Sequence, residues 1–180
     1  MKYIILGLLL LKSMTIYDIN KAFKNVISLF YSPSYGSIKT TTKNLLDKKY
    51  VECKGEVIKG RNKIVYTILE TGKKEFINWM LSEIPPNKLE VVGLSKLFLL
   101  GLIDDDEDKI KIVSDIVNTI KSEKGKLEIL KKEIQSNKVP KGYEKIFFFQ
   151  LKTLGYGLNS YQFSLIWFEK LLKELKAQNF

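Results

Sequence analysis

The stretch from residue 32 to residue 50 carries the side chains with the clearest chemical potential. Ile38, Thr42 and Leu45 recur at helical spacing, so we expect them to face a core. A helix whose outer face is small, polar and basic can enter the major groove of DNA, where lysine meets phosphates or guanine edges and threonine or asparagine reads base edges. Taken alone, the stretch favours an ordinary solvated helix face. The face opposite the core carries small, polar and basic residues, namely Gly36, Lys39, Thr40, Lys43 and Asn44.

Local signals predict the start of this helix and the segments before it. Ser32 can accept hydrogen bonds from free N–H groups, and Pro33 suits the first helical position because its missing N–H has no partner there. Residues 3–11 are apolar on nearly every side, which predicts a buried first helix. Thr15, with Asp18 three residues later, predicts the start of a second helix. Three short helices joined by tight breaks form a helix-turn-helix type of arrangement.

A β-hairpin is predicted directly after the third helix. Residues 51–59 and 63–68 alternate apolar and polar side chains on either side of a turn at Gly60-Arg61-Asn62. Three helices followed by a two-stranded ribbon is the order of a winged helix, in which the third helix enters the major groove and the ribbon, or wing, contacts the DNA backbone or the minor groove. After such a helix, a basic tip favours nucleic-acid binding over mere solubility. The basic residues of the tip are Lys59, Arg61 and Lys63.

The charge and composition of the chain agree with a polyanionic partner and exclude several kinds of site. The 180 residues include 30 basic and 20 acidic side chains, a net charge of +10. Residues 1–84 contribute +7 of this, from 14 basic and 7 acidic side chains, so the bias towards anions lies in the first half. The absence of histidine and the single cysteine exclude most zinc sites, cysteine–histidine nucleophiles and the Ser-His-Asp triad. We therefore expect no metal, no cofactor and no enzymatic activity.

The single cysteine and the N-terminal residues bear on location. Cys53 cannot form an intramolecular disulfide, so a reducing compartment is expected. The apolar run at residues 3–11 is too short to cross a bilayer, and no small-residue cleavage site follows it. The sequence therefore predicts a cytoplasmic protein without membrane attachment.

Beyond the hairpin, the sequence predicts helices throughout. Thr71 is expected to cap the first of them, and Pro85-Pro86 ends it, so we place a domain boundary there. The acidic run at residues 104–108 suits the positively charged start of a helix. A long amphipathic helix is expected after it, over residues 109–135.

The C-terminal segment is rich in aromatic residues. We expect a helix over residues 143–154, a break at Gly155–Gly157 and a last helix from about Asn159. These helices are too few and too one-sided to bury their apolar faces alone, so a second subunit is the natural cover. The predicted fold is mainly α with a small β-hairpin: a winged helix-turn-helix domain over residues 1–84 and an all-helical dimerisation domain over residues 87–180.

With these pieces in place, the chain resembles the PadR family of transcriptional regulators. The family's first two helices are similar to ILGLLLLKSMTIYDINKAF, its recognition helix to SPSYGSIKTTTKNLLDKKYV, and its wing and following helix to GRNKIVYTILETGKKEF. The resemblance covers residues 4 to about 80. The tail is similar to the helical C-terminal dimerisation domain of the family's longer branch, which is related to virulence activators.

The resemblance implies a homodimer that binds double-stranded DNA, commonly as a repressor on a pseudo-palindromic operator, and that a small aromatic or hydrophobic effector can release. The position after Ile38 is most often tyrosine in the family and is Lys39 here, so roles at individual bases are not transferred. The residues that the resemblance places at the DNA are Tyr35, Lys39, Thr40 and Lys43 on the third helix, with Lys59, Arg61 and Lys63 on the wing.

Two alternatives stand beside this interpretation. A winged helix can bind a protein partner instead of DNA, although the basic third helix and wing argue against it. Phe148, Tyr161 and Trp167 could line an effector pocket, but aromatic residues at helical spacing more often form a core or an interface. An enzyme is the weakest interpretation, because the sequence shows no nucleophile–base pair and no glycine-rich phosphate loop.

Overall fold

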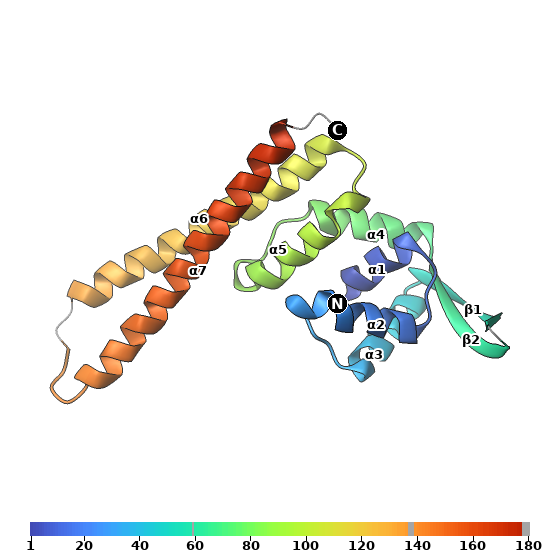
Figure 1. Ribbon diagram of the computed structural model, residues 1–180, viewed down its shortest axis with the longest axis horizontal. Coiled ribbons are helices and arrows are strands. Elements are labelled where there is room, and N and C mark those ends of the chain that lie inside the picture. The colour runs from blue at the N-terminus through green and yellow to red at the C-terminus, as the bar shows by residue number, and fades with distance from the viewer. Residues whose placement is uncertain (59, 137–138, 178–180) are drawn as a thin grey trace. The chain divides into compact units, whose positions relative to one another are not determined.

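The computed structural model describes residues 1–58, 60–136 and 139–177, and it is mainly helical with one two-stranded antiparallel sheet in that part of the chain (Figure 1). A winged helix-turn-helix region followed by long C-terminal helices confirms the predicted fold class. The chain divides into two compact units: residues 1–83 with 90–105, and residues 84–89 with the chain from residue 106 onward. The division into a DNA-binding and a dimerisation domain stays a prediction; residues 90–105, which it places in the second domain, group with the first unit.

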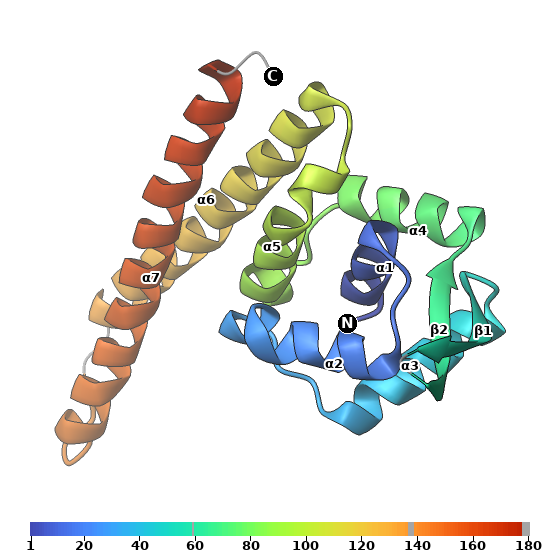
Figure 2. The same cartoon turned by 45° about the vertical axis from the view of Figure 1, so that its right-hand side comes forward.

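The first unit is built around its first helix. Figure 2 shows α1 at the centre of this unit, and α1 contacts α3, α4 and β2. The elements of the unit, in chain order, are α1 (Lys2–Leu11), α2 (Ile16–Asn25), the 3-10 turn η1 (Ile27–Leu29), α3 (Tyr35–Asp47), β1 (Val51–Ile58), β2 (Arg61–Ile68), α4 (Glu70–Leu81), α5 (Leu89–Phe98) and the 3-10 turn η3 (Leu100–Leu102).

The helix α1 is buried on nearly every side, as its composition predicts. Ile5 and Leu6 are fully buried. A β-carbon built on Gly7 would lie 2.7 Å from the side chain of Leu99 and 3.1 Å from the ring of Phe76, so α1 packs closely here because residue 7 has no side chain. Apolar side chains on all faces of a helix are stable only when neighbouring elements cover all of those faces, and the first unit supplies that cover.

The start of α2 has the predicted cap in full. The Thr15 hydroxyl oxygen accepts the backbone N–H of Asp18 (3.2 Å), and the Asp18 carboxylate accepts the backbone N–H of Thr15 (3.1 Å). The Thr15 hydroxyl also donates to that carboxylate at 2.7 Å and is the main reason that the pKa of Asp18 lies below its usual value. This reciprocal capping box leaves fewer helix N–H groups unsatisfied and directs the chain into α2.

The helix α3 begins later than predicted. Its N-cap is Ser34, whose hydroxyl accepts the backbone N–H of Ser37 at 3.2 Å, and not Ser32 with Pro33 at the first helical position. Both serines satisfy the same local rule, and the structure selects the one whose hydroxyl reaches a helical N–H group. The predicted inner face is confirmed: Ile38, Thr42 and Leu45 are buried.

The wing is a regular antiparallel hairpin whose turn is tighter than predicted. Val51 pairs with Ile68 at its base and Ile58 pairs with Arg61 at its tip. Arg61 and Asn62 therefore belong to β2 and not to the turn, and Gly60 occupies the turn with φ 73°. A left-handed residue suits a two-residue hairpin turn, and glycine adopts that conformation without steric cost.

A third chain segment joins the wing at its base. Met14 pairs with Tyr66 as an isolated antiparallel bridge, with backbone N–H to O distances of 3.0 and 2.9 Å. Beside it, the hydroxyls of Ser13 and Thr67 lie 2.7 Å apart and share a hydrogen bond. The linker between α1 and α2, which the sequence suggests is only a turn, thus fastens β2 to the helical core.

The second unit is a pair of long antiparallel helices joined by a turn. The unit also includes the 3-10 turn η2 (Pro86–Lys88). The helices α6 (Asp106–Ser136) and α7 (Glu144–Ala177) lie side by side in both views (Figures 1 and 2). Val113, Val117 and Ile120 of α6 are buried. The ammonium of Lys121 lies 2.8 Å from the carboxylate of Glu169 and adds an ion pair between the helices.

The predicted break at Gly155–Gly157 is wrong, because α7 continues through both glycines. Glycine in a helix interior costs about 1 kcal/mol relative to alanine, which packing against a long neighbour can offset. Gly157 lies against α6, where an added β-carbon would meet Leu127 at 3.4 Å. Within the described residues, no helix combines the length and the apolar character needed to cross a membrane.

Candidate nucleic-acid interface

The outer face of α3 is polar, basic and open to solvent. Lys39, Thr40 and Lys43 are exposed, while Ile38 and Leu45 on the same helix are buried. Tyr35, the first residue of the helix, is 53% exposed. The structure therefore gathers six predicted residues on one accessible surface, which we call the α3 face: Tyr35, Gly36, Lys39, Thr40, Lys43 and Asn44.

Four cations of the α3 face and of the wing take part in none of the ion pairs of the described residues, namely Lys39, Lys43, Arg61 and Lys63. A cation that already pairs with a carboxylate must break that pair before it meets a phosphate, whereas these four need not. The arrangement is suited to contacts with a polyanionic backbone.

The wing presents two of its three predicted basic residues on an exposed ribbon. Arg61 and Lys63 are exposed, and their partners in the register are Ile58 and Glu56. Lys59 lies outside the described residues. The wing therefore keeps a basic character near its tip, although Glu56 opposite Lys63 reduces the local positive charge.

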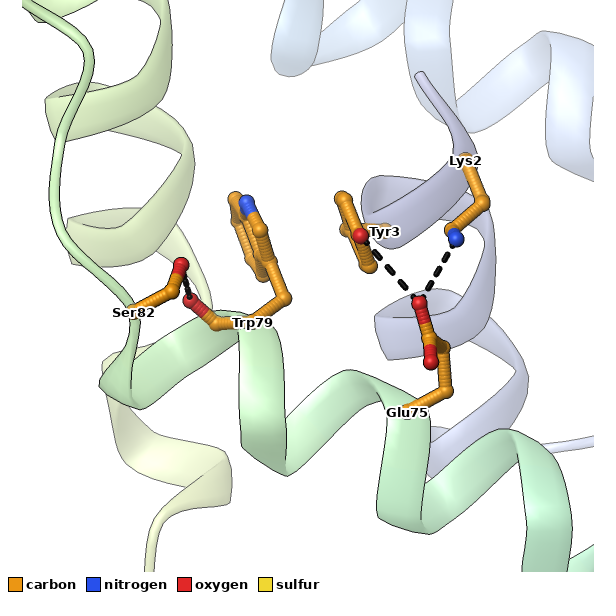
Figure 3. Close-up of polar contacts among 5 residues, drawn as sticks. All are labelled: Lys2, Tyr3, Glu75, Trp79 and Ser82. Atoms are coloured by element: carbon orange, nitrogen blue, oxygen red, sulfur yellow. Dashed lines mark hydrogen bonds and ion pairs between the residues drawn. The ribbon is translucent and has the colours of Figure 1, made fainter.

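Around Glu75 of α4, a small polar cluster connects this helix to α1. The ammonium of Lys2 donates to the carboxylate of Glu75 at 2.7 Å, and the Tyr3 hydroxyl donates to the same oxygen at 3.2 Å (Figure 3). The ring of Tyr3 stacks on that of Trp79, with centroids 4.6 Å apart. The hydrogen bond from Lys2 is the main cause that holds the pKa of Glu75 below its usual value of 4.5.

Replacing Glu75 with glutamine is expected to lower the free energy of unfolding by about 0.5–1 kcal/mol at neutral pH, because a partly exposed ion pair is lost. Since the pKa of Glu75 is lower in the folded protein than in the unfolded chain, its contribution is complete above pH 4.5 and disappears as the pH falls through the lowered value. Urea unfolding of both proteins between pH 7 and pH 3 measures this. A difference that stays constant down to pH 3 would contradict the expectation.

The three aromatic residues predicted for an effector pocket all lie on α7. Phe148 and Trp167 are 53% and 44% exposed, and Tyr161 is half-buried. Two shallow hollows of the second unit are lined by other residues, one at Val139 and Phe147 and the other at Lys124 and Asn159. The effector pocket stays a prediction.

The sequence alone does not reveal the residues that hold the α3 face and the wing in place. Met14 pairs with Tyr66 from a segment without any strand-like alternation, and the Thr71 hydroxyl donates to the carbonyl of Lys49 instead of capping α4, whose N-cap is Leu69. Both contacts join segments far apart in the chain. The sequence signal for the contact between Thr71 and Lys49 is a threonine followed by glycine at the start of a helix. The same signal predicts a local helix cap equally well.

The sequence of the first unit matches a known protein family. Residues 5–78 match the profile described as the transcriptional regulator PadR-like family. A negative transcriptional regulator, PadR of Bacillus subtilis, is 28% identical over 110 residues, which is 59% of this chain and 60% of that protein.

Solved structures align over nearly the whole chain. The crystal structure of Bacillus subtilis PadR with operator DNA has a TM-score of 0.46 at 21% identity and covers 97% of this chain and 98% of that one. The same regulator with p-coumaric acid gives 0.42 at 22%, covering 97% and 94%. The virulence activator AphA of Vibrio cholerae gives 0.42 at 20%, covering 98% of each chain.

The residues of the sequence match are also the residues that form the winged helix. The matched residues contain α1, α2, α3, the wing and most of α4, which are the elements of the winged helix. Regulation of transcription agrees with the expectation that the chain is not an enzyme. Residues 5–78, which contain the winged helix, are similar to the PadR-like family of transcriptional regulators.

Proposed function

We propose that the protein is a repressor that binds a pseudo-palindromic operator as a homodimer. The observation that carries the proposal is the α3 face, an exposed basic and polar surface directly followed by a wing with basic residues near its tip. The Bacillus subtilis relative is a negative regulator, and it has been crystallised with operator DNA. Two α3 helices in successive major grooves would lie roughly 34 Å apart.

The residues of the α3 face and of the wing have different roles, which follow from their chemistry. Lys39, Lys43 and Arg61 neutralise phosphates and set the affinity. Thr40 and Asn44 carry both donors and acceptors, so they discriminate between bases or fix the helix on a phosphate. The absence of a side chain at Gly36 lets the backbone of α3 approach the DNA closely.

Exposed apolar residues of α7 support the homodimer. Tyr156, Phe163 and Trp167 are 75%, 71% and 44% exposed, on a helix whose inner face already packs on α6. Large aromatic side chains in water are costly, and burying them against a second copy recovers about 25 cal/mol for each Å² removed from water. The same helix carries Phe148 and Tyr161, and the relative's complex with p-coumaric acid supports a small aromatic effector for this chain.

Titration against DNA tests the proposal. The purified protein is mixed with the DNA upstream of its own coding sequence or with an unrelated duplex of equal length, at several salt concentrations. We expect tighter binding to the upstream DNA with two protomers for each site. With about eight phosphate contacts, log K falls against log salt with a slope near −7. The proposal would be contradicted if the protein bound its own upstream DNA, the other upstream regions of the same genome and the unrelated duplex equally and weakly. That result would favour a protein partner.

A further inference from the structure

The segment that leaves α3 has an unusual backbone. Lys49 has φ 55°, a left-handed conformation that residues other than glycine seldom adopt. Around it, the N–H of Tyr50 donates to the carbonyl of Leu45 at 3.0 Å, and the N–H of Lys49 donates to that of Leu46 at 2.9 Å. These two bonds form a Schellman motif, which ends the helix and turns the chain at once into β1 at Val51. Residues 48–50 thus form the joint between the recognition helix and the wing.

The first turn of α4 is seated on this joint. The backbone N–H of Leu69 donates to the carbonyl of Tyr50 at 2.9 Å, and the Thr71 hydroxyl donates to the carbonyl of Lys49. Gly72 is buried beside them. A β-carbon built on Gly72 would lie far inside the van der Waals distance of the Tyr50 carbonyl oxygen and 2.9 Å from the side chain of Ile68. The joint therefore fits against α4 only because residue 72 has no side chain.

The remainder of α4 is held just as firmly. Glu75 accepts hydrogen bonds from Lys2 and Tyr3 of α1. At the C-terminal end, Lys96 of α5 is 1% exposed, donates to the backbone carbonyl of Ser82 and lies 5.7 Å from the ring centre of Trp79. A cation at this end complements the helix dipole. The helix α4 is thus a rigid piece with fixed contacts at both ends, and its N-terminal end sets the joint.

We propose that Thr71 and Gly72 are positioning residues for DNA recognition, which set the orientation of α3 relative to the wing without touching DNA. The inference rests on the function proposed above. The carbonyls of Lys49 and Tyr50 are fixed by α4, so a displacement at this contact shifts the turn between the end of α3 and the start of β1 and changes the angle between them. Specific recognition needs both elements to meet the duplex in register, whereas non-specific attraction needs only their charges.

The variant Gly72→Ala tests the role of the close approach, with Gly101→Ala of the same unit as the matched control, because a β-carbon at position 101 meets nothing within 4 Å. Alanine is the better helix former, so a loss caused by Gly72→Ala does not arise from helix propensity. We expect at least a tenfold loss of affinity for the operator, with unrelated duplex affinity, its salt slope and the protomer ratio unchanged. Gly101→Ala is expected to match the wild type.

Thr71 supplies a second pair of variants, which remains informative if Gly72→Ala does not fold. Its side chain is exposed, so Thr71→Val removes the hydroxyl with little change in packing. Thr71→Ser retains the hydroxyl and is expected to restore the operator affinity that Thr71→Val loses. A purely structural contribution would reduce operator and unrelated-duplex binding in proportion to the folded fraction and would leave their ratio unchanged.

Amide hydrogen exchange in the free protein separates this inference from the proposed function. We expect faster exchange at Tyr50 and Leu69 in Gly72→Ala and Thr71→Val, because those amides lie in the joint. If the wild type has no preferred DNA sequence, the proposed function fails, and the inferred role in recognition fails with it even where exchange changes. An unchanged ratio of operator to unrelated-duplex affinity in Thr71→Val overturns the inference while leaving the proposed function intact.

Discussion

Replacing Lys43 and Arg61 together with alanine is expected to weaken binding to the operator about 1,000-fold, because the proposed dimer loses four cations from the α3 faces and wings and each is worth about 1 kcal/mol. Lys43 is exposed on α3, Arg61 begins β2, and neither belongs to an ion pair among the described residues. The loss therefore reflects missing contacts with DNA and not a disturbed fold. The slope of log K against log salt is expected to become shallower by about 3 to 4, since each phosphate contact contributes about 0.9.

A matched control removes the same charge elsewhere. Lys132 of α6 and Lys173 of α7 are exposed, and neither occurs in an ion pair within the part of the chain that the structure describes. Their double alanine variant lowers the net charge equally, so it measures the effect of charge alone. Titrations of both variants in the same salt series decide the question. Unchanged operator affinity in the Lys43 and Arg61 variant would overturn the assignment of the α3 face and the wing to DNA.

Truncating Phe76 to alanine is expected to lower the free energy of unfolding by about 3–5 kcal/mol, the usual cost of removing a fully buried phenyl ring. Phe76 is 0% exposed and packs between α4 and α1, where a β-carbon on Gly7 would lie 3.1 Å from the ring. The neighbouring helices are held by other contacts and cannot collapse fully into the space, so a cavity remains.

Ile77 on the same helix provides the control for this prediction. It is 36% exposed, so Ile77→Ala is expected to cost less than about 1 kcal/mol. Urea unfolding at one protomer concentration compares the two, because the stability of the proposed homodimer would depend on concentration. Equal midpoints for the two variants would contradict the burial of the Phe76 ring in the core of the first unit.

The local signals that were decisive in the sequence are those whose donors and acceptors lie within one helical turn. The Thr15–Asp18 capping box is one example, since both of its hydrogen bonds close within four residues. The inner face of α3 is another, because Ile38, Thr42 and Leu45 can be buried together only on a helix. The order of three helices and a hairpin followed from such signals, and so did the exposed and basic character of the α3 face.

Local rules gave wrong predictions in two situations. Either two neighbouring residues satisfy a rule equally, or packing against a distant segment decides the local structure. Ser32 and Ser34 both suit an N-cap, and the hydroxyl that reaches Ser37 defines the start of α3. The two glycines of α7 predict a break, yet packing along α6 keeps the helix continuous. Lys96 would be placed in solvent by its charge, but the end of α4 and the ring of Trp79 give its ammonium partners inside the fold.

The sequence by itself therefore determined the fold class, the order of three helices and a hairpin, and the set of side chains that the α3 face exposes. Only the tertiary structure decided how those side chains are held, through the Met14–Tyr66 bridge and the seat of α4 on Lys49 and Tyr50. The physical reason is the range of the interactions. Helix periodicity and capping act over a few residues, whereas these contacts join backbone groups about 20 to 50 residues apart and exist only once the chain has folded.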